Sequence, residues 1–166
     1  MEIKINDYIF FKDNIINNVD NILNENSDIF ESELKAFNMY VAKLFGNYNT
    51  IDQIVFSDNK SDQGIDFYII NNDSLQIFQS KFLKFETLRK NENPISFNDD
   101  GVKDLENAYN YLFNNISKSP ANDKVKGLRA KIQIQDFEKI SFNLCVIGYL
   151  TEDAKEKFKN LQTFRK

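Results

Sequence analysis

Two neighbouring segments rich in isoleucine and phenylalanine, residues 65–71 and 75–84, constrain the fold of this chain more than any other feature. Between them stands the polar stretch Asn71-Asn72-Asp73-Ser74. Because Asn and Asp tolerate positive φ angles, a tight turn centred on Asn72 and Asp73 is expected. Aromatic and β-branched residues favour strands on either side of such a turn. The sequence therefore predicts a β-hairpin over residues 65–84.

Periodic apolar residues predict the elements around this hairpin. Helical spacing is expected over residues 6–24 and 28–46, with Ser27 and Asp28 as caps of the second helix and Gly46 at its end. The other expected elements are a strand at 51–57, helices at 99–116 and 123–137 separated by a loop at 117–123, a buried strand at 140–150 and a polar helix at 152–164. The order α-α-β-β-β-α-α-β-α indicates a mixed α/β domain with a central sheet.

At 166 residues the chain is long enough for one domain with its own hydrophobic core. We expect an N-terminal helix within residues 1–27 and the core of the domain within residues 28–160. No basic-then-apolar leader and no apolar stretch of membrane-spanning length stand in the sequence. The single cysteine, Cys145, lies in an apolar run and is expected to be a buried thiol rather than a nucleophile. Cytoplasmic localisation without membrane association is the expectation.

The complete absence of histidine narrows the chemistry that this chain can perform. It excludes Ser-His-Asp and Cys-His hydrolases, zinc sites built on histidine and nucleases with a histidine general base. Any catalysis must therefore use carboxylates, amides, lysines and a metal ion bound through oxygen.

The turn sets the register of the hairpin, and the register determines which polar residues lie next to each other. A two-residue turn pairs Asn71 with Ser74, and it places Asp66 opposite Gln79, with Cβ atoms roughly 4.5–5.5 Å apart. Lys81 lies two residues beyond Gln79 and shares its face, because side chains alternate along a strand. The flanking apolar residues point to the other side: Phe67, Ile69, Phe78 and Phe82.

These polar residues suit a hard divalent cation such as Mg²⁺ or Mn²⁺, which prefers oxygen ligands. Asp66 offers a carboxylate, Gln79 an amide oxygen and Ser80 a backbone carbonyl. Glu33 adds a further candidate ligand, since helical projection places it within the apolar stripe of its helix. Lys81 is suited to orienting an attacking water or to offsetting charge on a phosphate. From the residues alone, catalysis and a solvated hairpin surface explain this pattern equally well.

The net charge of −4 argues against indiscriminate nucleic-acid binding, but two local basic clusters remain. One runs from Lys118 to Lys131, and the other lies around Lys81 and Lys84. A phosphate backbone could follow the first cluster beside the metal site, although a solvated helix face is the commoner explanation. The candidate nucleic-acid contacts are Lys84, Lys124, Lys126, Arg129 and Lys131.

The stretch Gly64-Ile65-Asp66, followed by Ile77-Phe78-Gln79-Ser80-Lys81-Phe82, resembles the PD-(D/E)xK nuclease superfamily in its Mrr-like variant, in which Gln precedes x-Lys. More narrowly, the chain resembles the N-terminal domain of the AIPR family, which is linked to abortive infection and phage resistance. Residues 36–44 resemble the first core helix of that family, and residues 142–151 its later core strand. The resemblance implies a restriction-endonuclease-like core, with a central mixed β-sheet flanked by helices.

The resemblance also implies an activity: metal-dependent hydrolysis of DNA phosphodiester bonds in bacterial defence against phages. Asp66, Gln79 and Lys81 would be catalytic, and Mg²⁺ or Mn²⁺ would be held by Asp66 and Gln79 with Glu33 and Ser80. RNA is the alternative substrate. A single metal site cuts one strand, so double-strand cleavage would indicate a homodimer or clustered nicks.

Two departures from the family pattern support a rival hypothesis. Related sequences often carry Glu directly after the helix Phe, where this chain has Asn38, and Gln79 is neutral as well. The alternative is therefore a catalytically weak or inactive module that binds nucleic acid or assembles a complex. Because the family domain usually begins a longer polypeptide, a further C-terminal domain or a partner protein is also implied.

Overall fold

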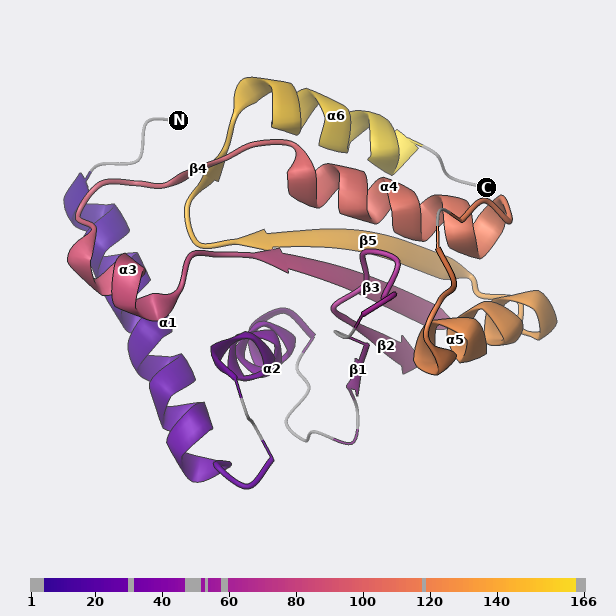
Figure 1. The fold of residues 1–166 in the computed structure, drawn as a ribbon, viewed down its shortest axis with the longest axis horizontal. Helices are drawn as coiled ribbons and strands as arrows, with labels where there is room; N and C mark the ends of the chain where they lie inside the picture. Colours follow the sequence, from indigo (N-terminus) through magenta and orange to yellow (C-terminus); the bar gives the residue numbers. More distant parts are fainter. Residues whose placement is uncertain are drawn as a thin grey trace.

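A mixed four-stranded sheet with helices on both faces forms the centre of the domain (Figure 1). The computed structural model describes residues 5–29, 32–46, 52, 54–57, 60–117 and 119–163. Its elements, in chain order, are α1 (Ile5–Glu25), α2 (Glu33–Gly46), β1 (Val55–Phe56), β2 (Phe67–Asn71), β3 (Ser74–Lys81), α3 (Phe85–Lys90), β4 (Ser96–Phe97), α4 (Asp100–Phe113), α5 (Asp123–Ile134), β5 (Lys139–Val146), β6 (Tyr149–Leu150) and α6 (Glu152–Thr163).

The sheet has the strand order β1-β2-β3-β5. β1, β2 and β3 are antiparallel neighbours, whereas β5 lies parallel to β3. A parallel neighbour requires a crossover, and the chain between β3 and β5 supplies it with α3, β4, α4 and α5. β4 and β6 form a separate, short parallel pair. The expected mixed α/β fold with a central sheet is therefore confirmed.

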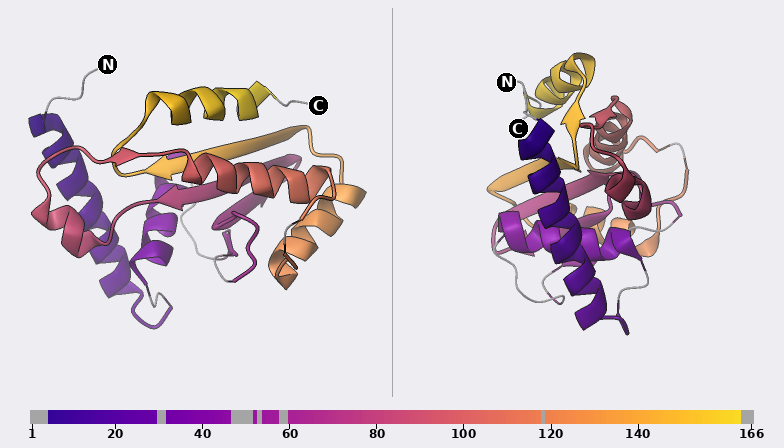
Figure 2. Two further views of the ribbon diagram at one scale, coloured as in Figure 1. Left: turned by 45° about the horizontal axis from the view of Figure 1, so that its top comes forward. Right: turned by 90° about the vertical axis from the view of Figure 1, so that its left-hand side faces the viewer.

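Alternating side chains of the hairpin contribute to two hydrophobic cores, one on each face of the sheet. The ribbon views show helices on both sides of the sheet (Figures 1 and 2). Residues of α1, α2 and α3 cover the first face, and residues of α4, α5 and α6 cover the second. The first core contains Phe67, Ile69 and Phe78, with Phe82 packed against it. The second core contains Tyr68, Leu75 and Ile77. The predicted apolar side of the hairpin is confirmed, but its opposite side is covered as well.

The helices agree with the expected ranges apart from their ends. α2 begins at Glu33 rather than at residue 28, and its first turn is capped by Ser32, whose Oγ accepts a hydrogen bond from the Lys35 amide at 3.4 Å. Ser27 and Asp28 belong to a preceding turn, so their prediction as caps was wrong. α5 ends at Ile134. Among the described residues, no helix combines the length and apolar character needed to cross a membrane.

Three strand predictions need correction. Of the strand expected at 51–57, only Val55–Phe56 pairs, and residues 51 and 53 lie outside the described part. The second hairpin strand ends at Lys81 rather than at residue 84, and the helix α3 follows. The strand expected at 140–150 is interrupted at Gly148, where φ is +155° and an added Cβ would lie 2.3 Å from the Ile95 carbonyl oxygen. This close approach directs the chain into β6, beside β4.

Candidate active site at the end of the hairpin

The hairpin turn has the predicted register, but the ladder ends one pair before Asp66. Pairing runs from Asn71–Ser74 to Phe67–Phe78. Beyond it, the Asp66 amide donates to the Phe78 carbonyl at 3.0 Å, so Asp66 does not lie directly opposite Gln79. The extra residue on β2 changes the direction of the strand at this point, as a β-bulge does.

Beyond the end of the backbone ladder, the Asp66 side chain accepts the hydrogen bond of a β3 amide. Its Oδ2 accepts a hydrogen bond from the Ser80 amide at 2.7 Å, and that bond is buried. The Asp66 carbonyl in turn accepts from the Ser57 amide at 2.8 Å. A carboxylate that replaces a backbone acceptor is held at a fixed place beside β3, and a charge-assisted bond of this kind is stronger than a neutral one.

Burial distinguishes between the two explanations of the polar pattern. Asp66 is 6% exposed, Gln79 is 4% exposed and Ser80 is 5% exposed. Side chains on a solvated hairpin face would remain largely in water. The structure therefore contradicts the solvated-surface explanation for Asp66 and Gln79, and their burial needs another reason, because buried polar groups require partners.

Asn38 of α2 reaches the end of β3 from the face of the sheet opposite to α4. The Ser80 hydroxyl donates to Asn38 Oδ1 at 2.7 Å, and Asn38 is fully buried. Two amide atoms in this region, Asn38 Nδ2 and Gln79 Oε1, are buried without a hydrogen-bond partner among the described residues. Each leaves bonding capacity for a ligand, an ion or a water.

Lys81 lies on the α4 face of the sheet, in reach of an acidic partner. Its Nζ is 2.7 Å from Asp104 Oδ2, and its side chain keeps 36% of its surface exposed. α4 comes this close because Gly101 carries no side chain: an added Cβ would lie 3.1 Å from Lys81 Cγ. Gly101 and Asp104, one helical turn apart, thus hold the stem and the head of Lys81 between them.

A second carboxylate approaches this pair from the loop before β2. Asp62 Oδ1 accepts from the Gly64 amide at 2.8 Å. The pKa of Asp62 is raised, mainly because burial disfavours its charged form and also because Asp104 repels it, while the Gly64 hydrogen bond and Lys81 act in the opposite direction. Lys81 therefore lies in an environment that is more acidic than the sequence motif alone suggested.

The thiol of Cys145, beside Ser80 in the parallel register, belongs to the same neighbourhood. Burial, and to a smaller extent the charge of Asp66, raises the pKa of this thiol to about 12. A thiol with this pKa is protonated at neutral pH, and thiolate rather than thiol is the nucleophile. Cys145 is therefore unsuited to covalent catalysis.

The Glu33 carboxylate, a candidate metal ligand, has a hydrogen-bond partner at the start of α3. Its Oε2 accepts a hydrogen bond from the Phe85 amide at 3.1 Å, at the first residue of α3. A carboxylate at a helix N-terminus is favourable because it satisfies an otherwise unpaired amide. The α2 side chain that the Ser80 hydroxyl binds at the end of β3 is Asn38.

The basic helix α5 lies along the hairpin rather than at Lys81. Asn122 caps it and donates to the Ser57 carbonyl, whereas Gln135 at its end donates to the carbonyl of Asn72 in the hairpin turn. Lys81 is about 23 Å from that turn along β3, at a rise of ~3.3 Å per residue. Only the beginning of α5 is thus near Asp66.

The candidate nucleic-acid contacts differ in how they are engaged. The Lys124 ammonium donates to the Phe56 carbonyl at 2.6 Å, and Lys126 pairs with Asp123 at 3.0 Å. The Arg129 guanidinium lies 5.1 Å from the Tyr111 ring centre. Lys84 and Lys131 are exposed. Lys118 lies outside the described residues.

The donor set permits a weakly held divalent cation. The Asp66 carboxylate, the Gln79 amide oxygen and the Ser80 carbonyl are hard oxygen donors, and Mg²⁺ usually keeps several waters besides one or two carboxylates. In the described part of the chain, no three carboxylate, cysteine or histidine side chains lie together in a way that could hold a metal. The unpartnered Gln79 oxygen is the observation that favours a cation here.

Two residues of this site were missed from the sequence: Asp104 as the partner of Lys81, and Asp62. The sequence did carry a signal for Asp104: it lies three residues after Gly101 and four before Ala108, and these spacings place the three residues on one face of a helix. Asp62 carried no periodic signal, since it lies in a loop.

Comparison of the chain with protein-family models, with curated proteins and with solved structures found no match.

Proposed function

We propose that this chain is a metal-dependent nuclease that hydrolyses DNA phosphodiester bonds at the end of the β2–β3 hairpin. One observation carries the proposal: Asp66 and Gln79 are buried together, and the Gln79 amide oxygen has no hydrogen-bond partner in the described part of the structure. Lys81 lies two residues further along β3 and remains accessible. This combination suits a cation site next to a phosphate.

The architecture agrees with the resemblance to the PD-(D/E)xK superfamily, which implies a mixed sheet flanked by helices. The antiparallel hairpin carries Asp66 and the Gln79-Ser80-Lys81 motif, and α2 contributes Asn38 to the same end of β3. A role in bacterial defence against phages is the biological part of this proposal, and it rests on the resemblance to the AIPR family alone.

Each residue has a distinct role in the proposed reaction. Asp66, Gln79 and the Ser80 carbonyl would hold Mg²⁺ or Mn²⁺, which when bound polarises the phosphate and lowers the pKa of a water. Lys81 would orient the attacking water and offset negative charge on the phosphate. Asp104 holds the Lys81 ammonium at a fixed place, and the exposed basic residues of α5 would contact the nucleic-acid backbone.

A second function has its own supporting observation. Among the proposed cation ligands, Asp66 is the single carboxylate, because Gln79 is neutral and the Glu33 carboxylate accepts from the Phe85 amide. This favours a nuclease-fold module that binds nucleic acid or assembles a complex without catalysis. RNA instead of DNA is the alternative substrate in either case.

Incubation of the purified protein with supercoiled plasmid, and in parallel with RNA, tests the proposal in Mg²⁺, Mn²⁺ and EDTA. Cleavage should require a metal, and Asp66→Ala and Lys81→Ala should each reduce the rate by about 100-fold or more. Asp73→Ala in the exposed hairpin turn and Lys139→Ala at the exposed start of β5 are matched controls that should cleave normally. If the folded protein cleaves neither DNA nor RNA with any of these metals, the nuclease proposal is rejected and the non-catalytic module is favoured.

A further inference from the structure

A pocket of about 160 Å³ opens directly beside Lys81, between the ends of β3 and β5 and the beginning of α4. It is smaller than the roughly 300–1,000 Å³ of pockets that enclose drug-sized ligands. Its size therefore suits one planar ring system rather than a larger molecule.

The floor of this pocket is apolar. Leu144 and Val146 of β5 pair with Gln79 and Lys81 of β3, so their side chains lie next to the motif. Both are only partly buried, although they belong to the central sheet. Phe97 and Leu150 also line the pocket, and it is bordered by Phe82, whose ring packs against Phe37 and Phe85 in the first core. Apolar and aromatic surface beside an accessible lysine is typical of a site for a flat group that carries a negative charge.

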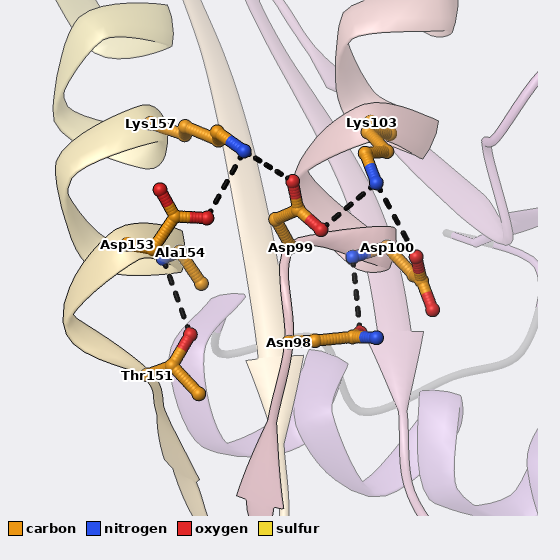
Figure 3. Close-up of polar contacts among 8 residues, drawn as sticks. All are labelled: Asn98, Asp99, Asp100, Lys103, Thr151, Asp153, Ala154 and Lys157. Carbon is orange, nitrogen blue, oxygen red and sulfur yellow. Dashed lines mark hydrogen bonds and ion pairs between the residues drawn. The ribbon is translucent and has the colours of Figure 1, made fainter.

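The rim of the pocket is polar and is held in place by α4 and α6. Asn98 Oδ1 accepts from the Asp100 amide at 3.2 Å (Figure 3). Between these two residues, Asp99 is bound by Lys103 of α4 and by Lys157 of α6. Gly101 forms the adjoining wall, where an added Cβ would lie 2.7 Å from Leu144. The rim thus presents an amide and a carboxylate at positions that are fixed by the surrounding contacts.

The charge of Lys81 is accessible to a ligand despite its ion pair. An ammonium has three donors, and the described ion pair joins it to a single oxygen of Asp104. A phosphate oxygen can therefore be bound at Lys81 while Asp104 keeps the ammonium in place. The apolar residues Leu144 and Val146 of the neighbouring strand β5 line the pocket beside it.

We propose that this pocket binds one nucleobase of a nucleotide whose phosphate lies at Lys81; the proposal rests on the nucleic-acid substrate proposed above. The base lies on the floor of Leu144, Val146 and Phe97, since stacking and apolar contact accept any flat base. Carboxylate and amide groups pair with the exocyclic amino groups of cytosine and adenine. The rim residues Asn98 and Asp100 therefore favour these bases over thymine. Bases in a duplex are stacked and paired, so the substrate class is single-stranded or locally opened DNA.

Calorimetric titration in EDTA tests the pocket without any cleavage. Deoxycytidine 5′-monophosphate should bind roughly ten-fold more tightly than inorganic phosphate or deoxycytidine, because only the nucleotide reaches both the floor and Lys81. Thymidine 5′-monophosphate should bind more weakly than the cytidine nucleotide. Backbone amide resonances of Phe97–Gly101 and Leu144–Leu150 should shift on titration.

Val146→Phe fills the pocket and should abolish the advantage of the nucleotide over phosphate. Ile134→Phe, at the exposed end of α5, adds the same ring elsewhere and should bind as the original chain does. Asn98→Ala, an exposed position, serves if Val146→Phe fails to fold, and it should remove the preference for cytidine over thymidine. Equal binding of nucleotide and phosphate, or unchanged binding by a folded pocket variant, would overturn the proposal.

Plasmid cleavage, measured separately in Mg²⁺, distinguishes this proposal from the proposed function. Cleavage without nucleotide binding in the pocket would retain the nuclease and reject the base pocket. Nucleotide binding that is lost in Val146→Phe, in a protein that does not cleave, would retain the pocket and favour the non-catalytic nucleic-acid-binding module.

Discussion

Single residues at the end of β3 determine the chemistry of this domain. Asp66, Ser80 and Asn38 form a buried chain of hydrogen bonds that joins the residue before β2 to β3 and α2. Such networks fix one arrangement because an unsatisfied member is costly in a low-dielectric interior. The unpartnered Gln79 oxygen and the unpartnered Asn38 Nδ2 are therefore exceptions among the described polar atoms of this site, and exceptions of this kind point to function.

Gly64 is the residue at which the loop before Asp66 meets α4. Its φ is +83°, and an added Cβ would lie 2.1 Å from the Asp104 carbonyl oxygen. We expect Gly64→Ala to lower the free energy of unfolding by about 2–5 kcal/mol, since positive φ and overpacking both oppose alanine. Urea denaturation measures the loss. Gly127→Ala in α5, where nothing lies within 4 Å of the added Cβ, should instead stabilise by about 0.5–1 kcal/mol.

Glu33 offers a test of the metal-ligand hypothesis. Because its carboxylate accepts from the Phe85 amide, Glu33→Ala should lower the free energy of unfolding by about 1 kcal/mol. The affinity for Mn²⁺, followed by electron paramagnetic resonance, should stay unchanged, whereas Asp66→Asn should weaken it. Weaker Mn²⁺ binding in Glu33→Ala would restore Glu33 to the ligand set. Glu106→Ala, an exposed residue of α4, controls for the loss of one negative charge.

Among the elements, α4 connects the site with the rest of the molecule. One of its faces carries Gly101, Asp104, Leu105 and Ala108, at spacings of three and four residues. This face contacts β3, the Gly64 loop and the second core. The N-terminal end of α4 is tied to α6 through Asp99 and Lys157 (Figure 3). A shift of α4 would therefore move Lys81 and the rim of the pocket together.

The pairing of Asp99 with Lys157 and Lys103 predicts a pH dependence. Lys157 first and Lys103 second lower the pKa of Asp99 from 3.8 to about 2. A lowered pKa in the folded state means that Asp99 stabilises the fold above about pH 4 and loses this contribution as the pH falls towards 2. Asp99→Asn should therefore be less stable than the original chain at pH 7, and the difference should shrink between pH 4 and 3. Urea denaturation across this range measures it.

The control for that experiment is Asp100→Asn, since Asp100 is exposed and lies 3.7 Å from Lys103. Surface ion pairs contribute little to stability, so this variant should behave as the original chain does. A difference between Asp99→Asn and the original chain that is constant from pH 7 to pH 3 would contradict the role assigned to the Asp99 ion pairs.

At the scale of the whole molecule, the described residues form two hydrophobic cores that share one sheet. Adjacent residues of β3 contribute to opposite cores: Ile77 to that of α4 and α5, and Phe78 to that of α1 and α2. Neither core is independent of the other, because both depend on the same pair of strands. This arrangement predicts cooperative folding of the described domain.

Ile77→Ala and Phe78→Ala test this cooperativity, since both side chains are at most 2% exposed. Each should lower the free energy of unfolding by about 2–5 kcal/mol through lost burial and a residual cavity. Each should also shift one common transition, followed by far-ultraviolet circular dichroism and by tyrosine fluorescence. Two separate transitions in either variant would show that the cores unfold independently.

Local patterns in the sequence determined the hairpin register and most helices. The turn at Asn72 and Asp73 fixes the pairing of its neighbours, and the alternation of apolar residues then assigns Phe67 and Phe78 to one face. These features depend on residues that are close in the chain. Their prediction needed only turn geometry and periodicity.

Tertiary structure alone decided that Asp66 and Gln79 are buried, because the helices that cover them come from distant parts of the chain. It placed Asn38 rather than Glu33 at Ser80, and it gave Lys81 the partner Asp104. Periodicity tells which face a side chain takes but not which element will cover that face. That choice depends on long-range packing, and it turned a pattern compatible with solvated surface into a buried polar site.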